Sequence, residues 1–101
     1  MRTEEFTKWL NEIGLKKKTI QNRISNCRNV EKYYKDLDIQ FEKDKGDSIM
    51  NLLTYSIKDQ RNNLPPKHNI IIDGNILTGS STLKQAVNLY FCFCKLINEQ
   101  K

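Results

Sequence analysis

The chain has 101 residues, a formal net charge of +5 and a hydrophobic fraction of 38%. This length suits one domain over 1–101, and this composition is typical of a globular protein with one modest core. The longest apolar runs, such as LYFCFC, are too short to cross a bilayer, and the charged N-terminus is not that of a signal peptide. We therefore expect no membrane partner, and the excess of positive charge favours an anionic one.

Two helices are predicted in the first third of the chain, where apolar residues recur at helical spacing. Over 3–13 these residues are Phe6, Trp9, Leu10 and Ile13. We expect Thr3 to cap this helix, Trp9 to be mostly buried, and Gly14 to end it in a left-handed conformation. Over about 18–35 the apolar side consists of Ile20, Ile24, Cys27, Val30 and Tyr34. Arg23 and Glu31 project near that side, so they either flank the core or are paired there.

The middle of the chain gives weaker signals. The polar stretch 36–48 breaks the helical pattern, and we expect a connection held to the core by Ile39 and Phe41. A short helix over about 47–53 follows, with Asp47 or Ser48 as its cap. Residues 56–59 then have the spacing of a capping box that opens one more helical turn, which the paired prolines end.

The segment 70–77 leaves two alternatives open, a tiny hairpin around Asp73-Gly74 or an ordered loop pinned by isoleucines. The last helix is expected to run from a cap at Ser80 or Ser81 to about Asn98. The prediction is thus an all-α bundle of four to five helices, with this hairpin or long ordered loop before the last one.

Positive charge is concentrated in 14–35, GLKKKTIQNRISNCRNVEKYYK, which holds seven basic residues and one acid, a net charge of +6. On a helical wheel five residues lie within about 60° of one another, beside the apolar side. These residues, which we call the basic stripe, are Lys17, Gln21, Arg28, Lys32 and Lys35. The stripe fits the phosphate backbone of DNA, with further contacts expected from Lys16, Lys18 and Lys84. A solvated, solubilising surface is the equally weighted alternative.

No set of residues in the sequence indicates catalysis, a metal site or a cofactor. Cys92 and Cys94 project about 200° apart on a helix, so they cannot hold one zinc ion together. We interpret the three cysteines as buried small hydrophobes, and their odd number favours a reducing, cytoplasmic compartment. The lone histidine, His68, is expected in an exposed turn. The acids of the polar stretch, Asp36, Asp38, Glu42 and Asp44, are expected in a solvated linker or in salt bridges with the basic helix.

The order FTKWL-NEIGLKKKTIQNRISNCRNVEKYY resembles the start of the N-terminal, SAM-like core-binding domain of tyrosine recombinases and phage integrases. The matching positions are Phe6, Trp9, Leu10, Thr19, Ile20 and Ile24. The stretch SSTLKQAVNLYFCFC is similar to the family's final helix at Leu83, Ala86, Tyr90 and Phe91. The resemblance implies a non-catalytic module that clamps duplex DNA beside a separate C-terminal catalytic domain. The alternative function is a helical protein–protein interaction module, with the apolar last helix as the seam of a homo-oligomer.

Overall fold

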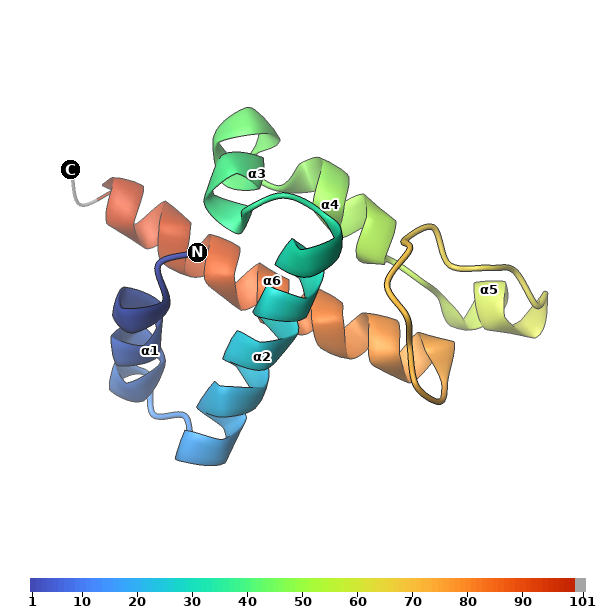
Figure 1. The fold of residues 1–101 in the computed structure, drawn as a ribbon, viewed down its shortest axis with the longest axis horizontal. Coiled ribbons are helices and arrows are strands. Elements are labelled where there is room, and N and C mark those ends of the chain that lie inside the picture. The colour runs from blue at the N-terminus through green and yellow to red at the C-terminus, as the bar shows by residue number, and fades with distance from the viewer. Residues whose placement is uncertain (100–101) are drawn as a thin grey trace.

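The structure, a computed structural model, describes residues 1–99, and within that range the regular elements are all α-helices (Figure 1). In chain order they are α1 (Thr3–Glu12), α2 (Lys17–Tyr33), α3 (Leu37–Asp44), α4 (Asp47–Leu53), α5 (Ile57–Arg61) and α6 (Ile76–Glu99). Five have seven residues or more, and α5 is a short helix of five. The prediction of a small all-α bundle is confirmed.

The 24-residue helix α6 is the element on which the others pack (Figure 1). The helix α2 crosses its middle, α1 lies beside its C-terminal half, and α4 and α5 lie toward its N-terminal end. Apolar residues every three or four positions give α6 a wide buried face. Its buried residues are Ser80, Leu83, Ala86, Val87, Tyr90, Phe91, Phe93 and Cys94. A single long helix therefore organises the core.

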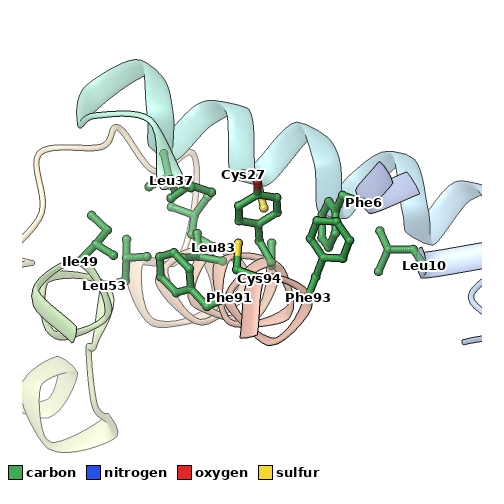
Figure 2. Close-up of a cluster of buried hydrophobic side chains, with 14 of the residues drawn as sticks. Phe6, Leu10, Cys27, Leu37, Ile49, Leu53, Leu83, Phe91, Phe93 and Cys94 are labelled. Atoms are coloured by element: carbon green, nitrogen blue, oxygen red, sulfur yellow. The ribbon is translucent and has the colours of Figure 1, made fainter. Parts of the chain in front are cut away.

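The core is formed where the other helices send side chains onto that face of α6 (Figure 2). Phe6 of α1 is fully buried, and its ring meets Tyr90 edge-on at a centroid distance of 5.0 Å and Phe93 at 5.6 Å. Leu10 is also fully buried. Trp9 stacks beside Phe6 with its ring centroid 6.2 Å away, but it is only partly buried. The tryptophan thus lies at the edge of the core and the phenylalanine at its centre.

The polar stretch 36–48 is not a connection but contains α3 and the start of α4, so that expectation is wrong. Asp36 caps α3 because its side chain accepts a hydrogen bond from the Asp38 N–H at 2.8 Å. Leu37 is fully buried, and the ring centroid of Phe41 lies 5.9 Å from that of Phe91. Ile39, by contrast, is 53% exposed. Two apolar residues four positions apart, Leu37 and Phe41, therefore pack α3 against the core.

Two helices begin differently from their predicted starts. α1 begins at Thr3 with Arg2 as its cap residue, so Thr3 is not the cap. Gly46 occupies the cap position of α4 in place of Asp47 or Ser48. It has a φ of +83°, and a Cβ there would come within 2.2 Å of the Phe91 ring. Glycine is therefore the residue that fits this position. The left-handed Gly14, with a φ of +91°, is as predicted.

The segment between α5 and α6 is an ordered loop, which decides between the two alternatives left open for 70–77. The capping box that opens α5 is formed by Ser56 and Asp59, as predicted. Ile70 is buried, and Ile72 packs so closely on Gly79 that a Cβ there would lie 2.4 Å from it. The predicted cap of α6 at Ser80 or Ser81 is wrong, because the helix already begins at Ile76. The Asn75 side chain accepts a hydrogen bond from the Thr78 N–H at 3.0 Å in the first turn.

Candidate nucleic-acid interface

The basic stripe lies on the solvent side of α2. All five of its residues are exposed, and so are Lys16 and Lys18 at the N-terminal end of the helix. Lys35 follows the C-terminus of α2, because the helix ends at Tyr33. The four ion pairs found within residues 1–99 all involve Met1 or Arg2. No carboxylate of the described residues therefore neutralises the stripe at close range.

Three acids at the end of α2 and just after it, Glu31, Asp36 and Asp38, contact the N-terminus of the chain instead. The Met1 ammonium contacts Glu31 Oε2 at 3.2 Å, Asp38 Oδ2 at 3.5 Å and Asp36. The Arg2 guanidinium lies 3.3 Å from Asp38 Oδ1. Glu31 also accepts a hydrogen bond from the Leu37 N–H at 2.8 Å. Asp36 and Asp38 therefore lie neither in a solvated linker nor in salt bridges with the basic helix, since their partners are Met1 and Arg2. Glu31, one of the two charged residues expected near the apolar side of that helix, is paired with the Met1 ammonium.

The electrostatics of this cluster follow from burial and proximity. Burial alone would lower the pKa of the Met1 ammonium, but the carboxylates of Asp36, Glu31 and Asp38 outweigh it, and the pKa is raised. Burial likewise opposes ionisation of Asp36, but its bond to the ammonium and the Asp38 N–H lower its pKa. The Tyr90 hydroxyl donates to Asp38 Oδ1 at 2.5 Å and accepts from the Arg2 N–H at 2.8 Å. Met1 and Arg2 are thereby fixed to both α3 and α6.

The residues near the start of α6 are not brought together with the stripe. Lys84 is partly exposed and lines a separate groove with Met50, Ser81, Gln85 and Asn88, between α4 and α6. No residue of α2 borders that groove. Ser80 is fully buried in α6 and is not available to a ligand. Lys84 therefore does not share a groove with the residues of the basic stripe.

A groove of about 390 Å³ lies where α2 gives way to α3. It is lined by Tyr33, Tyr34, Lys35, Ile39, Gln40 and Lys43. Lys35 belongs both to the basic stripe and to this groove. Tyr33 lies outside the predicted apolar side of α2, and no sequence pattern indicated Ile39 and Lys43 as its neighbours. The sequence signals for α3 are limited to the capping residue Asp36 and to Leu37 and Phe41 four positions apart, which is too little to establish a helical period.

His68 is buried, with 3% of its surface exposed, so the prediction of an exposed turn is wrong. Its Nε2 lies 2.8 Å from the Ser80 hydroxyl, and its Nδ1 accepts a hydrogen bond from the Ile70 N–H at 3.2 Å. Because Nδ1 is the acceptor, Nε2 carries the ring proton and donates it to Ser80. A nucleophilic serine needs an acceptor at that nitrogen and access to substrate. The pair is therefore a structural contact between the loop and α6.

The cysteines divide between core and surface. Cys27 and Cys94 are buried, whereas Cys92 is exposed, so the prediction of three buried cysteines is wrong at that position. Burial raises the pKa of the Cys27 thiol to about 12 and that of Cys94 to about 11. Within residues 1–99 no three side chains gather as a metal-binding group. In the same range, no helix combines the length and apolar character of a membrane span.

Comparisons of the chain with protein-family models, curated proteins and solved structures found no match. The resemblance to the core-binding domain of recombinases therefore stays a prediction. The geometry of the basic stripe and of the groove next to it is the basis on which a function can be proposed.

Proposed function

We propose that this chain is a non-catalytic DNA-binding module whose basic stripe contacts the phosphate backbone of a duplex. One observation carries the proposal. Three cationic side chains and one amide lie exposed along α2, and Lys35 follows directly after it. The acids nearest to them in sequence, Glu31, Asp36 and Asp38, contact Met1 and Arg2 instead. An uncompensated row of cations attracts a polyanion and releases its counterions.

The arrangement supports backbone contacts more than base reading. Ammonium and guanidinium groups on phosphates fix the position of a protein on DNA and carry no sequence information. Lys16, Lys17 and Lys18 stand at the N-terminal end of α2, whose free N–H groups also favour a phosphate. We propose the role that the recombinase resemblance implies, that of a clamp within a DNA-processing system of the cytoplasm, with catalysis in another domain.

Duplex binding measured against salt tests the proposal. A labelled 20-base-pair duplex is titrated with the wild type at several salt concentrations, and the slope of log affinity against log salt is measured. In the variant Arg28→Ala with Lys32→Ala the slope should become shallower by about 0.9 for each lost contact. The matched control is Lys58→Ala with Lys95→Ala, which removes two exposed charges from α5 and α6.

Two outcomes contradict the proposal. If the control weakens binding as much as the stripe variant does, the affinity depends on the net charge of the protein and not on the basic stripe. If the wild type binds no duplex at low salt, the phosphate function fails. Affinities for unrelated duplex sequences should fall by similar factors in the stripe variant, because backbone contacts are common to all of them.

A second function, dimerisation through helices, is favoured by a different surface. A groove of about 210 Å³ between α1 and the end of α6 is lined in part by Trp9, Phe93, Leu96 and Ile97, and Leu96 is 42% exposed. Sedimentation equilibrium at high salt tests this alternative, since an apolar dimer persists where charge contacts weaken. Leu96→Lys should shift such a dimer to monomer, and a wild type that is monomeric at all concentrations contradicts it.

A further inference from the structure

The groove at the junction of α2 and α3 has two exposed apolar walls. Tyr33, the last residue of α2, is 37% exposed, and Ile39, in the first turn of α3, is 53% exposed. The Tyr34 hydroxyl accepts a hydrogen bond from the Asn69 N–H at 2.8 Å, which fixes that ring as part of the groove. Large apolar side chains are more often buried, so an exposed pair lining one hollow indicates a binding surface.

The polar side chains of the same groove are unengaged. Among residues 1–99 no side-chain hydrogen bond or ion pair involves Lys35, Gln40 or Lys43. The two lysines place positive charge in the groove, and the Gln40 amide offers both donors and an acceptor. The groove therefore combines an aromatic face, an aliphatic face, a free amide and two ammonium groups.

We propose that this groove holds one unpaired nucleotide of a DNA strand. The base stacks on Tyr33 and contacts Ile39, the Gln40 amide meets the hydrogen-bonding edge of the base, and Lys35 and Lys43 contact the flanking phosphates. Aromatic stacking with cationic backbone contacts is the chemistry by which proteins bind single strands. The volume of about 390 Å³ lies within the range of small-ligand sites, about 300–1,000 Å³.

This inference rests on the proposed function, because Lys35 is shared by the groove and the basic stripe. A duplex that lies along α2 ends its contacts with the stripe where the groove begins. A single-stranded extension of that duplex can then enter the groove without leaving the basic surface. The preferred ligand of the chain is accordingly a junction of duplex and single strand, not an uninterrupted duplex.

The test compares two labelled DNAs that share one 20-base-pair duplex, one blunt and one with a five-nucleotide single-stranded extension. The wild type should bind the extended DNA about 5- to 150-fold more tightly, the range that one stacked base provides. Tyr33→Ala should abolish this preference and leave the affinity for the blunt DNA unchanged. Tyr33→Phe is the matched control, since it keeps the ring and should keep the preference. Lys43→Ala should reduce the preference without removing an aromatic side chain.

Each remaining outcome overturns the inference or the proposed function separately. If the wild type binds the two DNAs equally, or if Tyr33→Ala keeps the preference, the groove is not a nucleotide site. Duplex binding by the basic stripe is not contradicted by either result. If adenosine monophosphate at millimolar concentration removes the preference, the groove binds a free nucleotide, and a nucleotide within a DNA strand is not its ligand. If blunt duplex is not bound but a single strand is, with Tyr33→Ala abolishing that binding, the groove stands and the duplex function fails.

Discussion

The Nε2 atom of His68 lies 2.8 Å from the Oγ atom of Ser80, and both residues are buried. The contact joins the loop that precedes α6 to the buried face of that helix. Ile70 donates its N–H to the other ring nitrogen, and Ile72 packs against Gly79 one position before the serine. A single neutral imidazole therefore helps to hold the whole loop in place.

We predict that the free energy of unfolding falls as the pH is lowered through the titration range of histidine. Burial lowers the pKa of His68, because the charged imidazolium would lose its hydration in the protein interior. Below the unfolded value of about 6.5, the unfolded chain binds a proton that the folded chain does not bind. The contribution of His68 to the free energy of unfolding is therefore fully present above about pH 6.5 and is lost as the pH falls through the folded pKa. Urea unfolding between pH 5 and 8 measures it.

The same titration in two variants separates the histidine from other groups. His68→Asn removes the one imidazole of the chain and should flatten the dependence between pH 5 and 7. Ser80→Ala lowers stability at every pH by about 1 kcal/mol, the typical contribution of one hydrogen bond, but keeps the titrating ring and its slope. An unchanged slope in His68→Asn would show that the imidazole does not control the pH dependence.

We predict that Glu31→Gln lowers the free energy of unfolding by roughly 1–3 kcal/mol at pH 7. Breaking a fully buried pair costs about 3–5 kcal/mol, and the cost is smaller here because the carboxylates around the Met1 ammonium keep part of their hydration. The raised pKa of the ammonium gives stability that is complete below its unfolded value of about 8 and is lost as the pH rises through the folded pKa. The difference between wild type and variant should therefore shrink above pH 8.

The control for that variant is Glu42→Gln, at an exposed position of α3 that takes part in none of the ion pairs. It should change stability by less than about 0.5 kcal/mol. Urea unfolding of the three proteins at pH 7 and pH 10 gives the comparison. Equal effects of the two substitutions at pH 7 would refute a specific role for Glu31.

We predict that Gly46→Ala destabilises the protein more than Gly14→Ala does. Both glycines have a positive φ, +83° and +91°, so both substitutions carry about 1–2 kcal/mol of backbone strain. At Gly46 the added methyl also meets the Phe91 ring, whereas at Gly14 nothing lies within 4 Å. Overpacking adds about 1–3 kcal/mol, which is the expected difference between the two free energies of unfolding. A difference near zero would mean that the ring moves aside without cost.

The helices that sequence predicted well are those in which apolar residues repeat over several turns. In α6 the repeat runs from Leu83 to Ile97, and in α2 it runs from Ile20 to Val30. The exposure of the basic stripe follows from the same periodicity, which is why it could be predicted. In α3 only Leu37 and Phe41 reach the core among polar neighbours, too few positions to show a period.

Contacts that join distant parts of the chain had no local signal. The burial of His68 depends on Ser80, twelve residues away, and on an earlier start of α6 than its serines suggest. The pairing of Met1 with Asp36 spans 35 residues. The groove beside Tyr33 depends on where α3 packs, so it could be found only after α3 had been placed. The local sequence pattern thus predicted the basic stripe, whereas the groove beside it depends on tertiary packing.

We predict that Phe6→Ala costs more stability than Trp9→Ala, although tryptophan is the larger residue. Phe6 is fully buried between Tyr90 and Phe93, and its truncation should cost about 3–5 kcal/mol. Trp9 is partly exposed beside a groove, so part of its ring already contacts water, and about 1–3 kcal/mol is expected. A cost of 1 kcal/mol lowers the melting temperature of a domain of this size by about 4–8 °C, so thermal unfolding followed by circular dichroism resolves the two variants. If Trp9→Ala proved the more damaging, the tryptophan would contribute more to the core than its partial burial indicates.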